Sequence, residues 1–261
     1  MALEPRYTMN FDEIREEIES RGIDAEGYEC SYNDLLERVE NTIKARPRDD
    51  WGDLRAIRDY ALVLRQTLLH RAIKLFEGAI NALINDNGYS MVLSIRGHFE
   101  TTAAIGYLHN RLTSMRQGNL PPDVVDKDIA TQLIGTRDER ILEAAGEKFN
   151  LAEAKQVLNM LEYADKSVSK SILGGTAEEH TMLMDIYKWL CEFSHPNFHS
   201  NTLAFTLNKE KQEFHFSCDS KLSVKDAGLI ETILISSAIF EELYDLIEAL
   251  LPDGRGSNKS L

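Results

Sequence analysis

Apolar residues recur at the helical spacing of three or four positions along most of the chain. The longest run covers residues 50–86 and includes Leu54, Ile57, Ala61, Leu64, Leu68, Ala72, Leu75, Ala79 and Leu83. The segment Asn85-Asp86-Asn87-Gly88 favours a stop there, because Asn and Gly tolerate the left-handed backbone that ends helices. A second long run follows over residues 89–115. The pattern therefore predicts two long helices, joined by a tight turn, that pack antiparallel at the centre of a bundle.

Shorter helical patterns flank this pair. Residues 10–20 and 31–45 predict two acidic amphipathic helices before it. After it, the pattern predicts helices over residues 123–133, 137–148 and 151–171. Thr176 with Glu179 forms a capping box that predicts one more helix, ending at Ser194.

The periodicity changes to alternation in the stretch TLAFTLNKEKQEFHFSCD. Apolar residues occupy every second position on both sides of a charged turn: Leu203, Phe205 and Leu207, then Phe214 and Phe216. This predicts a β-hairpin, followed by a last long helix that ends at Leu251. The expected fold is an all-α bundle with two long antiparallel central helices and a small hairpin before the last helix. The expected domains are a helical extension (1–48), the bundle (49–251) and a disordered tail (252–261).

The charge balance narrows the classes of partner. Lys and Arg number 29 against 43 Asp and Glu, a net charge of −14, which disfavours a broad grip on duplex DNA. The longest apolar-rich segment, residues 229–251, carries five carboxylates, so we expect no membrane span. Three distant cysteines, at positions 30, 191 and 218, match no zinc or disulfide spacing. Together with a first segment that lacks an apolar leader, they predict a cytoplasmic protein.

Arg96 and Glu100 are the first candidates for a functional site. They lie four residues apart on the second long helix, so their side chains meet on one face. Such a pair is either a solvated ion pair or, if it points into the bundle, a buried pair that needs partners from other helices. The spacing alone leaves both interpretations open.

The stretch YKWLCEFSHPNFHS gathers further candidates at the end of a predicted helix. Tyr187, Leu190, Cys191 and Ser194 share one stripe of that helix, and Pro196 stops it at His195. His195 and Asn197 could satisfy carbonyl groups at the helix end. Alternatively, His195, Asn197 and His199 gather over the Arg96–Glu100 pair.

On the second interpretation, we expect His195 within hydrogen-bonding reach of Glu100. Imidazole transfers protons near neutral pH, and Arg is the natural partner of a phosphate or carboxylate. Arg96, Glu100 and His195 are then the candidate catalytic residues. Tyr187, Asn197 and His199 are the candidate residues for binding a small anionic ligand.

Two other site types are weakly indicated. Glu100, His195 and His199 would make a zinc set, but Pro196 prevents the two histidines from sharing a helix face, so we expect no metal and no cofactor. The nuclease spacing Arg-x4-His occurs at Arg65 and His70, which the composition explains by chance.

Two of these segments together resemble a known group of proteins. Arg96-x3-Glu100 on one helix, followed by Tyr187-x2-Leu-Cys-Glu-x2-His195-Pro-Asn197 at the end of a later one, resembles a group of uncharacterised bacterial helical proteins. Their layout is similar to that of the HEPN superfamily. The resemblance implies a homodimer, and either a metal-independent ribonuclease of a toxin–antitoxin or phage-defence system or an inactive binding module. No Arg precedes His195 at the superfamily's nuclease spacing.

The sequence therefore supports two functions. The first is a cytoplasmic binding or regulatory module of unknown ligand, with a polar Arg–Glu–His cluster between helices. The second is a HEPN-like ribonuclease or stress effector that acts on RNA. The residues alone do not decide whether the cluster is catalytic or structural.

Overall fold

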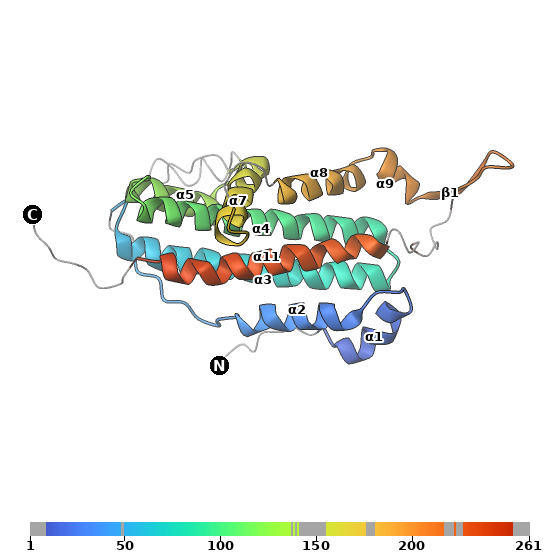
Figure 1. Cartoon of the computed structure of the whole chain (residues 1–261), viewed down its shortest axis with the longest axis horizontal. Helices are drawn as coiled ribbons and strands as arrows, with labels where there is room; N and C mark the ends of the chain where they lie inside the picture. The colour runs from blue at the N-terminus through green and yellow to red at the C-terminus, as the bar shows by residue number, and fades with distance from the viewer. Residues whose placement is uncertain are drawn as a thin grey trace, which may run out of the picture. The chain divides into compact units, whose positions relative to one another are not determined.

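The computed structural model describes residues 9–47, 50–136, 138, 140, 155–175, 181–216, 222 and 227–252. These residues confirm the predicted fold class: they are mostly helical, and a two-stranded antiparallel hairpin precedes the last helix (Figure 1). The predicted 137–148 helix (apart from Asp138 and Arg140), the Thr176–Glu179 capping box and the tail beyond Pro252 lie outside the described residues.

The predicted helices appear with small shifts of their ends. The long pair is α3 (Leu54–Ile84) and α4 (Gly88–Arg116), and α1 (Phe11–Glu19) lies within its predicted range. The second helix begins and ends earlier than the predicted 31–45. Asp24 sets its start by accepting a hydrogen bond from the Glu26 amide in the first turn. The remaining elements are α2 (Ala25–Glu37), α5 (Pro122–Ile134), α7 (Val157–Ser171), α8 (Met182–Ser194), α9 (Phe198–Thr202), β1 (Phe205–Asn208), β2 (Glu213–Phe216), the 3₁₀ turn η1 (Gly228–Ile230) and α11 (Glu231–Leu250).

The chain divides into two compact units, and the long helices contribute to both. Unit 1 comprises Met1–Arg38, His70–Thr101 and Met182–Ala238, and unit 2 comprises Val39–Leu69, Thr102–Thr181 and Ile239–Leu261. The expected segments 1–48, 49–251 and 252–261 stay a prediction. Along the described part of the chain, no helix combines the length and the apolar character needed to cross a membrane.

Unit 1 is organised around the facing halves of α3 and α4. Phe76 and Phe99 are fully buried in its core. The two helices approach closely at glycines: a Cβ at Gly78 would lie 3.0 Å from the Ser94 Oγ, and one at Gly97 would lie 3.0 Å from the Leu75 side chain. Pairs of residues equally distant from Asp86 along the sequence therefore face each other.

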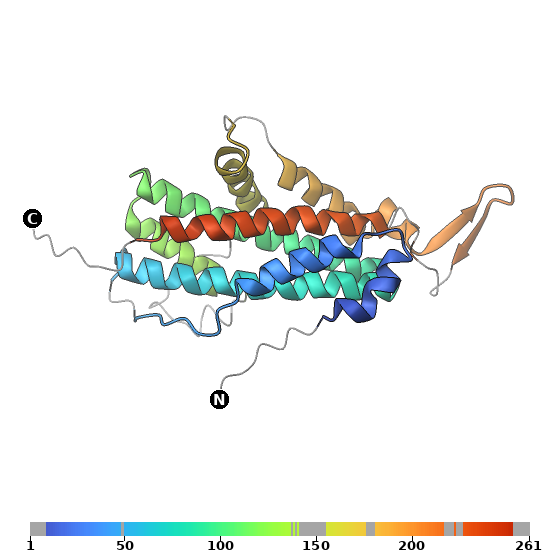
Figure 2. The ribbon, with the colours of Figure 1, turned by 60° about the horizontal axis from the view of Figure 1, so that its bottom comes forward.

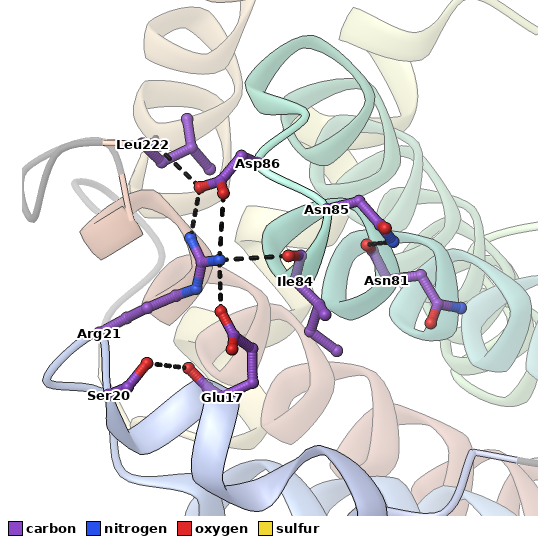
Figure 3. Close-up of polar contacts among 8 residues, drawn as sticks. All are labelled: Glu17, Ser20, Arg21, Asn81, Ile84, Asn85, Asp86 and Leu222. Atoms are coloured by element: carbon purple, nitrogen blue, oxygen red, sulfur yellow. Dashed lines mark hydrogen bonds and ion pairs between the residues drawn. The ribbon is translucent and has the colours of Figure 1, made fainter. Parts of the chain in front are cut away.

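One charged cluster joins the start of unit 1 to the α3–α4 turn. We call Glu17, Arg21 and Asp86 the Arg21 cluster (Figure 3). Asp86 occupies the left-handed region, with φ 54°, at the turn that the sequence predicts. Arg21 donates to Asp86 Oδ1 at 2.6 Å, to Glu17 Oε1 at 2.7 Å and to the Ile84 carbonyl at 3.1 Å. The Leu222 amide also donates to Asp86, at 2.9 Å, so the cluster ties together three segments of the chain: residues 17–21, the turn at 84–86 and Leu222.

Unit 2 packs α5, α7 and its parts of α3, α4 and α11 around a second core. Gly106 on α4 lets α7 approach so closely that a Cβ there would lie 2.5 Å from the Ala164 Cβ. Tyr107, Leu161, Ile129 and Phe240 are fully buried. Because both units rest on apolar helix faces at the predicted spacing, the sequence is sufficient to explain their cores.

Candidate functional site

The predicted Arg96–Glu100 pair is formed, and it lies in unit 1. Arg96 Nε lies 3.2 Å from Glu100 Oε1, and about a quarter of each side chain is exposed. The pair is therefore neither a fully solvated surface pair nor a fully buried one. Both side chains project from α4 toward α8, which the fold places beside it (Figures 1 and 2).

Tyr187 of α8 bridges the two charged groups. Its hydroxyl accepts a hydrogen bond from Arg96 Nη2 at 3.0 Å and donates one to Glu100 Oε1 at 3.1 Å. The guanidinium also lies 5.3 Å from the centre of the tyrosine ring, within cation–π range. Tyr187 is on the buried stripe of α8 with Leu183 and Leu190, so the packing of that helix fixes the position of the hydroxyl.

A second arginine, Arg71 of α3, completes the site. Its Nη2 lies 3.9 Å from Glu100 Oε2, and its Nε donates to the Thr101 hydroxyl at 3.0 Å. We call Arg71, Arg96, Glu100 and Tyr187 the Glu100 cluster. Arg71 is not among the predicted site residues, although the predicted turn at residues 85–88 contains the signal for it. Arg71 and Thr101 are equally distant from Asp86, so an antiparallel pair places them opposite each other.

The cluster carries an excess of positive charge. Two guanidinium groups share one carboxylate, for a local net charge of +1 in a chain of net charge −14. Within the described residues, the Nη1 groups of Arg71 and Arg96 have no hydrogen-bond acceptor. The Arg96 Nε is buried and does not meet hydrogen-bond geometry with Glu100 despite their proximity. Unused donors of two arginines thus gather at one place.

The protonation states suit a site for anions. Burial raises the pKa of Tyr187 to about 12, and the charge of Glu100 acts in the same direction, although Arg96 opposes it. Burial acts to lower the pKa of Arg96, but its hydrogen bond to Tyr187 and nearby negative charge outweigh this, so the pKa is raised. The phenol therefore keeps its proton and the guanidinium keeps its charge throughout the physiological range.

His195 does not join this cluster. It follows the last residue of α8 and is exposed, and the structure shows no hydrogen bond between its side chain and either Arg96 or Glu100 in the described chain. Its backbone amide donates to the Cys191 carbonyl at 3.1 Å and so extends the helix ladder. Tyr187, and not the predicted His195, is the hydrogen-bond partner of Glu100. The buried stripe of α8 that faces α4 runs through Tyr187 and Leu190 and does not reach the end of the helix.

The other candidates of this stretch also lie apart from the cluster. Asn197 donates to the exposed Glu192 carboxylate at 3.2 Å. His199 packs its ring against Phe193, with centroids 5.2 Å apart. Cys191 is a free, partly buried thiol one turn after Tyr187. Of the residues proposed from this segment, the structure therefore brings only Tyr187 to the Arg96–Glu100 pair.

The two weakly indicated sites are not assembled either. Nowhere in the described ranges do three His, Cys, Asp or Glu side chains gather as they would to hold a metal ion, so Glu100, His195 and His199 form no such set. Arg65 pairs with Glu248 at 2.7 Å and lies 4.0 Å from the Tyr244 ring. Its nuclease-like spacing to His70 thus coincides with a structural ion pair in unit 2.

Comparisons with known proteins add no further constraint. No protein-family model, no curated protein and no solved structure matches the chain.

Proposed function

We propose that the protein is a cytoplasmic helical binding module that holds a small anionic group at the Glu100 cluster. The observation that carries this proposal is the pairing of two arginines with a single carboxylate. Among the described residues, each guanidinium keeps at least one nitrogen without an acceptor, and a planar fork of donors suits the oxygens of phosphate or carboxylate.

The ligand that fits best is small. An extended nucleic-acid backbone would meet the field of a chain with net charge −14, whereas one phosphate or carboxylate needs only the local excess charge. The side chain of Arg71 is 56% exposed, so an anion that arrives from solvent meets this arginine first. Arg96 lies deeper, with 23% exposed, and is held in place by Tyr187.

The ribonuclease alternative is less well supported by this geometry. Metal-independent cleavage of RNA needs a group that moves a proton, and imidazole was the expected one. The exposed His195 does not reach the arginines, and the Tyr187 hydroxyl holds its proton too tightly to act as a base near neutral pH. The HEPN-like relationship stays a prediction of the sequence resemblance.

Thermal unfolding in the presence of simple anions tests the proposal. Inorganic phosphate, pyrophosphate and acetate are added separately to the full chain, with chloride at equal ionic strength as the reference. A ligand that binds only the folded state raises the melting temperature with its concentration. We expect this rise for the wild type and for Arg15→Ala, a control at a half-exposed ion pair with Glu29, but not for Arg71→Ala.

The same preparation separates the two functions. A labelled RNA incubated with the wild-type chain should stay intact. Cleavage that disappears in both Arg96→Ala and His195→Ala would favour the ribonuclease and overturn the binding module. A wild-type melting temperature that does not respond to any of the three anions would also contradict the proposal.

A further inference from the structure

The β-hairpin presents one face that is entirely apolar. Its strands pair antiparallel, with Phe205 opposite Phe216 and Leu207 opposite Phe214. Directly opposed residues point to the same side of a two-stranded sheet, so these four side chains share one face. The other face carries polar groups, among them Glu213 and His215, whose side chains lie 3.5 Å apart.

This face is uncovered in the single chain. Phe216 is 74% exposed, Phe214 56% and Leu207 47%. The hairpin extends beyond α9 and away from the other helices of unit 1 (Figures 1 and 2). The rings of Phe214 and Phe216 each pack edge-to-face with the ring of Phe205, at centroid distances of 4.9 and 5.8 Å. An isolated two-stranded hairpin is marginally stable in water, so its apolar face needs a cover.

The exposed area matches the needs of a small interface. An aromatic side chain presents roughly 150–250 Å², so the exposed fractions of the face correspond to roughly 300–400 Å². Two such faces together bring roughly 600–800 Å² of apolar surface. The apolar part of the smallest stable interfaces, with about 1,200 Å² in total, is about 700 Å².

The charge distribution favours an identical face as the cover. The apolar face bears no charged side chain, and Lys209, Glu210, Lys211 and Glu213 at the turn sum to zero. Two chains of net charge −14 repel each other in general, and the hairpin is a place where they can meet without local repulsion. An anionic membrane surface, in contrast, offers an apolar layer only behind a negative potential that opposes the approach of this chain.

We propose that two copies of the chain associate through this face, with the hairpins packed face to face about a two-fold axis. Such an interface is isologous: each side chain of the face meets the same set of side chains on its partner. Because the area is at the low end for stable interfaces, the dimer forms reversibly and depends on protein concentration. The inference does not depend on the ligand of the Glu100 cluster.

Sedimentation velocity of the full chain tests this pairing. Over about 1 to about 200 µM, the wild-type mass should rise from 29.6 kDa toward twice that value. Phe214→Ser/Phe216→Ser should remain at 29.6 kDa over the same range. Leu158→Ser, at a residue of α7 that is 53% exposed, is the matched control and should dimerise as the wild type does.

Folding of the variants is checked by circular dichroism and thermal unfolding. If the double variant does not fold, Phe216→Lys serves instead, because it places like charges on the two faces and should give a folded monomer. A wild-type chain that stays monomeric at the highest concentration would overturn the proposal. So would a dimer that survives in the folded hairpin variants, or one that Leu158→Ser abolishes equally.

Discussion

Two arginine–carboxylate clusters of unit 1 differ in which charge is in excess. In the Arg21 cluster one guanidinium lies between two carboxylates, and a backbone carbonyl takes a further hydrogen bond (Figure 3). In the Glu100 cluster one carboxylate lies between two guanidinium groups. The first has a local net charge of −1 and the second of +1.

The arginine side chains of the two clusters also differ in their exposure to solvent. The Arg21 side chain is 10% exposed, and both of its terminal nitrogens have acceptors. Arg71 is 56% exposed, and its Nη1 has no acceptor among the described residues. An arginine whose terminal nitrogens are used within the protein has a structural role, whereas one with free donors beside solvent has capacity left for a ligand. The two clusters should therefore respond differently to the same substitution.

Arg21→Ala should have the largest effect on stability. It removes the arginine that Asp86 contacts at the point where three segments meet, so we expect a loss of about 2–4 kcal/mol in the free energy of unfolding. Urea denaturation followed by circular dichroism measures this loss. Arg15→Ala, at a half-exposed pair with Glu29, should cost less than about 1 kcal/mol. Equal losses of unfolding free energy in Arg21→Ala and Arg15→Ala would contradict a structural role for the Arg21 cluster.

Arg96→Ala should have a small effect on stability and a large effect on phosphate binding. Glu100 keeps Arg71 and the Tyr187 hydroxyl, so we expect a stability loss of only about 1 kcal/mol. Phosphate affinity, measured by isothermal titration calorimetry, should fall by about 10- to 100-fold because a charged hydrogen-bond donor is lost. If Arg21→Ala weakened phosphate binding as much as Arg96→Ala does, the contrast between the clusters would fail.

The sequence predicts the helices and the hairpin of unit 1 better than it predicts the composition of the Glu100 cluster. The periodicity of apolar residues was sufficient to predict α3, α4 and the hairpin. The four-residue spacing of Arg96 and Glu100 was sufficient to predict that their side chains meet. Tyr187 was predicted as a ligand-binding residue, but the place beside Glu100 was assigned to His195 at the polar end of the helix. Tyr187 lies on the stripe that faces α4, and only the rotation of α8 about its axis decides this. That rotation depends on packing, which a one-dimensional pattern does not contain.

The pH dependence of binding sharpens the assignment of Tyr187. Its pKa is raised to about 12, so the phenol stays protonated below that pH and deprotonates only above it. Phosphate affinity of the Glu100 cluster should therefore vary by less than about threefold from about pH 8 to about pH 9, where phosphate is mostly the dianion and an ordinary imidazole is neutral. A fall in affinity through this range would indicate a different titrating group in the site.

The raised pKa also predicts a stability trend at high pH. Between about pH 10 and pH 12 the folded chain holds the Tyr187 proton more tightly than the unfolded chain does, so stability falls as the pH rises. Tyr187→Phe should reduce the slope of unfolding free energy against pH in this window. An unchanged slope would mean that the hydroxyl is not held as the structure places it.

His195→Ala should have the smallest effect. The side chain is exposed and makes no hydrogen bond to the Glu100 cluster in the described structure, so stability should change by less than about 0.5 kcal/mol. Phosphate affinity should match that of the wild type. A loss of binding similar to that of Arg96→Ala would restore His195 to the site.

The phosphate affinity of Glu100→Gln tests the central claim most directly. If an external anion takes a place beside the two arginines, removing the carboxylate raises the local net charge from +1 to +2 and removes a competitor. Calorimetry at constant ionic strength should then show phosphate binding about 3- to 10-fold tighter than in the wild type. Binding that weakens or disappears in a folded Glu100→Gln chain would contradict the account, because the arginines would then serve Glu100 alone.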